Sequence, residues 1–149
     1  SEVCEGAETY QQTISKKEKF QFSELQKIDE AIAISSMSIA RNMDIKAIIA
    51  LTESGSTALM MSRIRSDIPI YAFTRNEFTQ RRVSLYRGVT SYPYKFRANT
   101  FTEVLAEVSK ELLQSQMVRV GDLVLITSGS PLKVEGHTNS LRIIEISDR

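Results

Sequence analysis

The chain has 149 residues, of which 42% are hydrophobic and 25% are charged, and its formal net charge is +1. This size and composition predict one soluble globular domain with a core of its own. A net charge near zero favours neither a nucleic-acid nor a membrane partner. We expect no signal peptide and no membrane span, because no apolar run has the required length and flanks. The single cysteine, Cys4, excludes an internal disulfide and favours a reducing, cytoplasmic location.

Residues 1–22 are predicted to lie outside the compact domain. A short apolar helix fragment at the start is followed by a charged connector, Lys-Lys-Glu-Lys, at residues 16–19. Charge clusters of this kind usually form solvated linkers. The domain itself is expected to comprise residues 23–149, because Ser23 and Gln26 have the spacing of a capping box at the start of a helix.

From residue 23 onwards, helical and strand patterns alternate along the chain. Apolar residues that recur every three or four positions predict helices, and short apolar runs between turn residues predict strands. The predicted helices span residues 23–43, 57–65, 77–86 and 100–117. The predicted strands span residues 46–51, 69–74, 89–94, 123–127 and 140–146. Asn76 is the expected N-cap and Gly88 the expected end of the third helix, and Pro93 favours an edge position or a strand end.

This alternation predicts an α/β fold with three layers, in which helices cover both faces of a five-stranded, mostly parallel sheet. The last two strands have no helix between them and are joined by a loop over residues 128–139. Two connections are open, an antiparallel return or an irregular crossover. We favour the antiparallel return, so the last strand is expected to run against the others.

The turn after the first predicted strand is the most informative candidate site. Residues 51–57 read Leu-Thr-Glu-Ser-Gly-Ser-Thr, so four hydroxyl groups and one glycine lie between a strand and the first turn of a helix. Unpaired N–H groups and the positive end of the helix dipole can hold a phosphate there. The alternative interpretation is an ordinary N-cap formed by Ser or Thr. Residues 128–139 follow another strand at the same edge, where ligands bind in such sheets, which favours the phosphate interpretation.

No catalytic or metal-binding constellation is recognisable in the sequence. His137 is the single histidine and has no familiar metal-ligand spacing to Cys4, so we interpret it as a solvated loop residue; a ligand contact or a pH-sensitive group is the alternative. A basic cluster near the third helix is interpreted as a source of surface salt bridges, with anion binding as the alternative. Its members are Arg75, Arg81, Arg82 and Arg87. These residues alone predict a binding or regulatory domain without a catalytic site or a metal.

Five motifs, taken together and in this order, resemble the C-terminal domain of pyruvate kinase. They are Leu-Thr-Glu-Ser-Gly-Ser-Thr-Ala at residues 51–58, Ala-Phe-Thr-Arg-Asn at 72–76, Leu-Tyr-Arg-Gly-Val at 85–89, Gly-Asp-Leu-Val at 121–124 and Gly-His-Thr-Asn at 136–139. The resemblance covers essentially the whole chain. Residues 3–8 look like the end of the last helix of the catalytic barrel in that family, so residues 1–22 are expected to be a barrel remnant plus a linker.

The resemblance implies a regulatory role. In pyruvate kinases this domain holds an allosteric effector, usually a phosphorylated sugar, and helps to build the tetramer. The parent enzyme transfers a phosphoryl group from phosphoenolpyruvate to ADP in glycolysis, and its catalytic residues and its Mg²⁺ and K⁺ ligands lie in the barrel. The resemblance therefore implies no kinase activity and no cofactor for this fragment, and a dimer formed through the last strand.

The resemblance also assigns the candidate binding residues. The family's phosphate loop falls on Thr52, Glu53, Ser54, Gly55, Ser56 and Thr57. The family's effector-closing loop falls on residues 128–139. Its candidate members are Gly129, Ser130, Gly136, His137, Thr138 and Asn139.

Two departures from the family pattern bear on the effector. Glu53 stands where some fructose 1,6-bisphosphate-responsive members carry a lysine, and a carboxylate beside a dianion is unfavourable unless its side chain turns outward. The arginine that holds the second phosphate in those members aligns near Val104, which cannot neutralise a phosphate, and Arg97 is the nearby candidate to compensate. The expected effector is therefore a sugar or nucleoside monophosphate, as in the bacterial monophosphate-activated type. The alternative is a structural assembly domain with no functional effector site.

Overall fold

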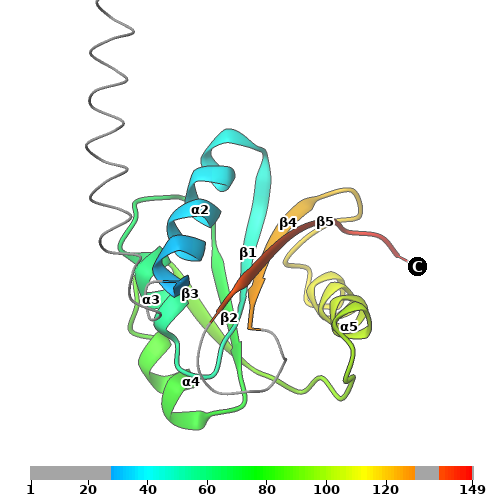
Figure 1. Ribbon diagram of the computed structural model, residues 1–149. Coiled ribbons are helices and arrows are strands. Elements are labelled where there is room, and N and C mark those ends of the chain that lie inside the picture. The colour runs from blue at the N-terminus through cyan, green and yellow to red at the C-terminus, as the bar shows by residue number, and fades with distance from the viewer. Residues whose placement is uncertain (1–27, 130–137, 149) are drawn as a thin grey trace, which may run out of the picture.

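A five-stranded sheet lies at the centre of the fold in a computed structural model that describes residues 28–129 and 138–148 (Figure 1). The strands are β1 (Ile45–Leu51), β2 (Ile70–Thr74), β3 (Val89–Pro93), β4 (Leu123–Ser128) and β5 (Ser140–Glu145). Their order across the sheet is β3-β2-β1-β4-β5. All neighbouring pairs are parallel except β4 and β5, which are antiparallel, so the predicted mixed sheet and its antiparallel last strand are confirmed.

The strand β1 is central, and from Ala47 to Leu51 its sequence is apolar without alternation. Four consecutive residues, Ala47 to Ala50, are completely buried. A strand buried on both faces needs apolar side chains at every position, which is the pattern of a central parallel strand. Its register places Ile49 beside Tyr71 of β2 on one side and beside Ile126 of β4 on the other.

Helices cover both faces of this sheet, as the three-layer prediction requires (Figure 1). The helices α2 (Ile28–Asn42), α3 (Ser56–Ser62) and α4 (Glu77–Val83) lie on one face, and α5 (Phe101–Gln114) lies on the other. Two core clusters result. Met37, Met61 and Val83 belong to the first cluster, together with inward-facing strand residues. The second cluster joins Leu112 and other α5 residues to Phe73.

Helix α2 ends at Asn42, close to its predicted end at residue 43, whereas the predicted ends of α3, α4 and α5 are wrong by three residues each. Helix α4 ends at Val83 rather than at residue 86, because the N–H groups of Leu85 and Tyr86 bond three residues back, at 3.1 and 3.0 Å, in tighter turns. Gly88 therefore does not end the helix. It has a φ of +73° and its carbonyl accepts a hydrogen bond from the N–H of Ile70 at 3.0 Å, which leads the chain into β3.

Two local predictions are confirmed. The side chain of Asn76 caps α4 by accepting hydrogen bonds from the N–H groups of Phe78 and Thr79, at 2.9 and 3.3 Å. Pro93 ends β3, which is an edge strand of the sheet formed by the described residues. The other predicted ends differ as well, since α3 ends at Ser62 and α5 at Gln114.

The predicted capping box of Ser23 and Gln26, and the predicted barrel remnant and linker at residues 1–22, lie outside the described residues. Within the two described segments, no helix combines the length and the apolar character needed to cross a bilayer.

Candidate functional site

The turn at residues 52–57 begins where β1 ends and is closed by its own hydroxyl groups. The Thr52 Oγ1 atom accepts a hydrogen bond from the N–H of Gly55 at 2.8 Å. The Ser54 hydroxyl accepts from the N–H of Ser56 and donates to the Ser56 hydroxyl, both at 3.3 Å. The N–H of Thr52 donates to the carbonyl of Phe73 at 3.0 Å, so the start of the turn remains attached to β2.

Gly55 determines how the turn enters helix α3. Its φ of +81° is in the left-handed region, which glycine adopts without steric cost. A Cβ atom at this position would lie 2.7 Å from Cγ1 of Val83 and 3.2 Å from Cγ2 of Thr79, so the turn packs directly on α4. The N-cap of α3 is Gly55 itself, with no side-chain capping bond. The alternative interpretation, an N-cap formed by Ser or Thr, is therefore wrong.

A hydroxyl pair joins the turn to the second candidate loop. The Thr57 Oγ1 atom donates to Thr138 Oγ1 at 2.7 Å, although the two residues are 81 positions apart, and both are buried. Next to this pair, the N–H of Asn139 donates to the carbonyl of Ser128 at 3.1 Å. The structure therefore brings Thr57 together with the end of the 128–139 segment. Gly129 is described too, whereas Ser130, Gly136 and His137 lie outside the described residues.

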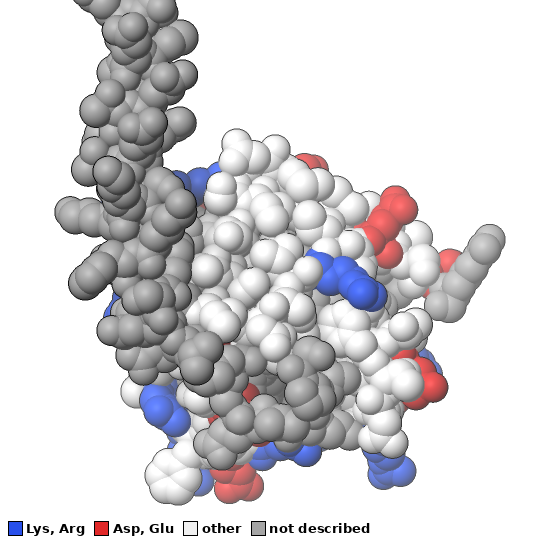
Figure 2. Space-filling view, in the orientation of Figure 1, with Lys and Arg blue, Asp and Glu red and all other residues white. Residues whose placement is uncertain are grey.

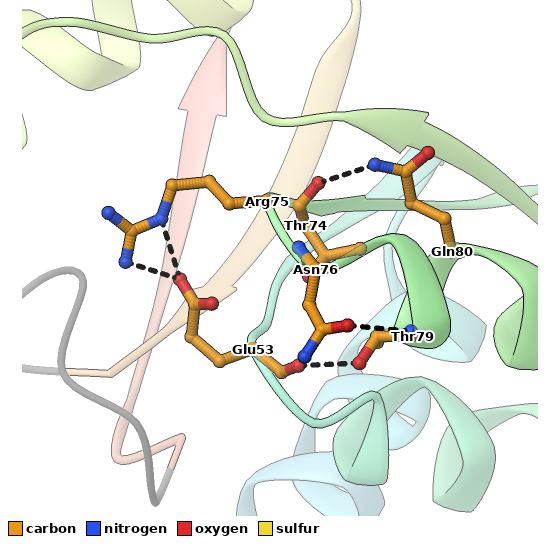
Figure 3. Close-up of polar contacts among 6 residues, drawn as sticks. All are labelled: Glu53, Thr74, Arg75, Asn76, Thr79 and Gln80. Carbon is orange, nitrogen blue, oxygen red and sulfur yellow. Dashed lines mark hydrogen bonds and ion pairs between the residues drawn. The ribbon is translucent and has the colours of Figure 1, made fainter.

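Glu53 is attached to its surroundings through both its backbone and its side chain (Figure 3). Its carbonyl oxygen accepts a hydrogen bond from the Thr79 hydroxyl at 2.7 Å. Its Oε1 atom accepts from Nε and Nη2 of Arg75, at 3.1 and 2.8 Å. The side chains are 24% exposed for Glu53 and 42% exposed for Arg75, so this ion pair is partly accessible to water.

The strand register explains why Glu53 meets Arg75. Leu51 of β1 pairs with Phe73 of β2, and Glu53 and Arg75 each follow two residues later. Phe73 in turn pairs with Tyr92 of β3, and Tyr94 follows two residues after that. Because alternate residues of a strand face the same side, these three side chains continue the row that packs toward α5.

Tyr94 closes this row at the edge of the sheet. The Arg75 guanidinium lies 5.9 Å from the centre of the Tyr94 ring, and the Tyr94 N–H donates to the carbonyl of Thr74 at 2.9 Å. Burial raises the pKa of the Tyr94 hydroxyl above its ordinary value; nearby Arg75 lowers this pKa, while Glu107 and Glu53 raise it further. Tyr94 is therefore a neutral phenol at physiological pH and adds no negative charge to the row.

Val104 and Arg97, the two residues considered for binding a second phosphate, lie in different environments. Val104 lies on the buried face of α5 and is completely buried, so it cannot reach a ligand. Arg97 is exposed in the segment between β3 and α5. A different arginine, Arg142 of β5, lies over the ring of Phe101 at the start of α5, 4.8 Å from its centre. The sequence contains no local signal for this contact, since 41 positions separate the two residues.

The described residues contain no group of three or more potential metal ligands, counted over His, Cys, Asp and Glu. A groove along α5, beside the residues that follow β5, is lined by Glu107, Lys110 and Asp148 among other residues, and none of its lining residues belongs to the turn. The sequence did not indicate that Thr79 contacts the turn. Its neighbours there, Glu53 and Gly55, are about 25 positions away in the chain, and they lie beside it only because β1 and β2 are adjacent in the sheet.

Comparisons with known proteins all relate the chain to one family. A family model described as "Pyruvate kinase, alpha/beta domain" matches residues 30–144. The chain is 40% identical over 146 residues to pyruvate kinase II of Salmonella typhimurium, covering 97% of the chain and 30% of that protein. It is 37% identical over 147 residues to pyruvate kinase of Buchnera aphidicola, with 98% and 30% covered. Against pyruvate kinase of Geobacillus stearothermophilus it is 38% identical over 121 residues, with 81% and 20% covered. The chain therefore spans about a third or less of the length of these relatives.

Proposed function

Because the chain belongs to the pyruvate kinase α/β-domain family, we propose that it is a regulatory domain that binds a phosphate monoester at the turn of residues 52–57. The enzyme that it would serve transfers a phosphoryl group from phosphoenolpyruvate to ADP. In this proposal the chain itself contributes binding and subunit contact, and no catalytic step.

The hydrogen bond between Thr57 and Thr138 is the observation that carries the proposal. It shows that the hydroxyl-rich turn and the end of the 128–139 segment meet at a buried point. A phosphate that accepts hydrogen bonds from the turn would therefore also be positioned against that segment. Such a ligand can couple distant parts of a protein when it binds two conformations with different affinity.

The turn has the chemistry that a phosphate requires. Hydroxyl groups rotate and can donate to phosphate oxygens in place of the bonds that they make within the turn. Gly55 gives the turn its left-handed backbone, at a φ of +81°, and the close contact with α4 that holds the hydroxyl groups at the start of α3. Val104 is an apolar, buried residue, so its position offers no cation for a second phosphate, which supports a monophosphate over a bisphosphate.

The proposal is tested by thermal unfolding of the chain with ribose 5-phosphate, glucose 6-phosphate, AMP, fructose 1,6-bisphosphate and inorganic phosphate. A ligand at 100 times its Kd stabilises a protein by about 2.7 kcal/mol, which is a clear increase in Tm. We expect at least one monophosphate to raise the Tm. The double variant Ser54→Ala/Thr57→Ala should lose this increase, because it lacks the Ser54 hydroxyl and the Thr57 hydroxyl that joins the turn to Thr138.

The matched control is Ser62→Ala, which removes a hydroxyl from the other end of α3, where it donates to the carbonyl of Leu59 at 2.7 Å. This variant is expected to respond to the ligand as the unmodified chain does. If all five compounds leave the Tm unchanged, the effector role is rejected, and the alternative of a purely structural assembly domain is favoured.

The interface part of the proposal rests on β5 and α2. In the sheet formed by the described residues, β5 is an edge strand, and such edges readily pair with a second chain. Helix α2 contributes the exposed apolar residues Ile28 and Ile34, and the exposed Met43 follows its last residue. Charged side chains are sparse on the face of the molecule between α2 and β5 (Figure 2). This surface suits a twofold contact between identical copies.

We therefore expect the chain to form dimers at micromolar concentration. Sedimentation equilibrium measures this directly, as a mass that rises with concentration from 16.8 kDa toward twice that value. A mass that stays at 16.8 kDa at every concentration would contradict a self-sufficient interface in this chain.

A further inference from the structure

We propose that Arg75 binds the phosphate monoester, and that the ligand then displaces the Glu53 carboxylate, to which Arg75 donates hydrogen bonds in the structure. The inference rests on the proposed function and deepens it. It identifies Arg75 as the side chain that neutralises the charge of the ligand. It also means that the Glu53 carboxylate competes with the ligand for Arg75.

The contact geometry supports this exchange. The hydrogen bonds that Nε and Nη2 of Arg75 donate to Glu53 converge on a single oxygen of its carboxylate (Figure 3). These two donors form one edge of the planar guanidinium group, which is the edge that binds carboxylates and phosphates alike. The Glu53 carboxylate therefore occupies the place on Arg75 that a phosphate oxygen would need.

The backbone on both sides of the pair is held, so the exchange requires only side-chain rotation. The Glu53 carbonyl is bound by the hydroxyl of Thr79, which is itself completely buried. Next to Arg75, the Thr74 hydroxyl accepts from the N–H of Asn76 at 3.2 Å, and the Thr74 carbonyl accepts from Nε2 of Gln80 at 3.1 Å. Neither residue can leave the row as a whole, but each long side chain can turn.

The relative strength of the two pairings favours the phosphate. Glu53 and Arg75 are both partly exposed, and ion pairs in such positions are weak because water and salt screen them. A phosphate monoester carries more charge than a carboxylate and offers three acceptor oxygens to the same donors. Arg75 also lies against the face of the Tyr94 ring, which limits how far the guanidinium moves during the exchange.

The charge arithmetic gives the two partners opposite effects on binding. In the unmodified chain the charges of Glu53 and Arg75 cancel beside the turn. Glu53→Gln leaves Arg75 without its competitor, so the chain should bind ribose 5-phosphate about three- to tenfold more tightly at low salt. Arg75→Gln leaves a carboxylate without a cation and should weaken binding by more than about tenfold. Arg75→Lys keeps the positive charge but lacks the paired N–H donors of the guanidinium group. Its affinity for ribose 5-phosphate should therefore lie between those of the unmodified chain and Arg75→Gln.

The experiment is calorimetric titration of the chain and these variants with ribose 5-phosphate, at about 0.05 and 0.5 M salt. The matched control is the ion pair of Asp44 and Lys46, which lies at the opposite end of β1 with a nitrogen–oxygen distance of 3.2 Å. Asp44→Asn and Lys46→Gln make the same charge changes at the end of β1 that lies away from the turn, and we expect both to leave the Kd within about twofold.

The possible outcomes separate this inference from the proposed function. If the unmodified chain binds ribose 5-phosphate but Glu53→Gln and Arg75→Gln both weaken binding, or both leave it unchanged, the pair is merely structural and the exchange is rejected while the effector site stands. If the control pair changes the Kd as much as the Glu53 and Arg75 variants do, the effect is one of net charge and the exchange is also rejected. If neither the unmodified chain nor Glu53→Gln binds, both the exchange and the effector site are rejected.

Discussion

Replacing Gly55 by alanine should destabilise the domain by about 2–4 kcal/mol, because two separate costs add. The first is backbone strain, since alanine at a φ of +81° is in the left-handed region. The second is a steric clash, since the new Cβ atom would lie 2.7 Å from Cγ1 of Val83, a stiff, completely buried side chain. Urea unfolding, followed by circular dichroism, measures the change in the free energy of unfolding.

Two further variants separate these costs. Gly88→Ala has the same kind of strain at a φ of +73°, but its Cβ atom would meet no atom within 4 Å, so a loss of only about 1 kcal/mol is expected. Val83→Ala removes the clashing methyl group, so the double variant Gly55→Ala/Val83→Ala should lose less stability than the sum of the single variants. Equal losses for Gly55→Ala and Gly88→Ala would show that the turn does not pack on α4 as described.

Replacing Phe73 by alanine should lower the free energy of unfolding by about 3–5 kcal/mol, the range for large aromatic side chains removed from a core. Phe73 is 1% exposed and lies between the rings of Tyr92 and Phe96, each with its centre 5.4 Å away. Its carbonyl also holds the N–H of Thr52 at the start of the turn. The loss should appear as a decrease in Tm of about 10 °C for a domain of this size.

Phe78 provides the matched control for this substitution. It is 76% exposed on α4, so Phe78→Ala removes the same side chain from the surface and should change stability by no more than about 0.5 kcal/mol. A similar decrease in Tm for both variants would contradict the burial that places Phe73 in the core beneath the site.

The sequence predicts the order and type of the elements because each depends on local patterns. The apolar run that ends at Leu51 indicates a strand, Asn76 indicates the start of α4, and Pro93 indicates an edge or a strand end. The helix ends are less predictable, because the tight turns at Leu85 and Tyr86 follow the helix without any change in residue type.

The candidate site is only partly visible in the sequence, because its contacts depend on the sheet register. The turn at residues 52–57 is evident from its composition. Its ion pair to Arg75 follows from the pairing of Leu51 with Phe73, which no sequence pattern specifies, and the contact of Thr57 with Thr138 joins segments 81 positions apart. The sequence shows Glu53 as a carboxylate in the turn but does not indicate its partner, Arg75, which donates two hydrogen bonds to one of its oxygens.

The central claim is that a phosphate monoester binds at the turn of residues 52–57, and nuclear magnetic resonance tests it most directly. Amide signals of the ¹⁵N-labelled chain would be followed during titration with ribose 5-phosphate. The account predicts that the largest shifts occur at Ser54, Gly55, Ser56 and Thr57, with smaller shifts at Arg75 and Thr138. Saturating shifts centred instead on the groove along α5, at residues such as Lys110 and Asp148, or no shifts at millimolar ligand, would contradict it.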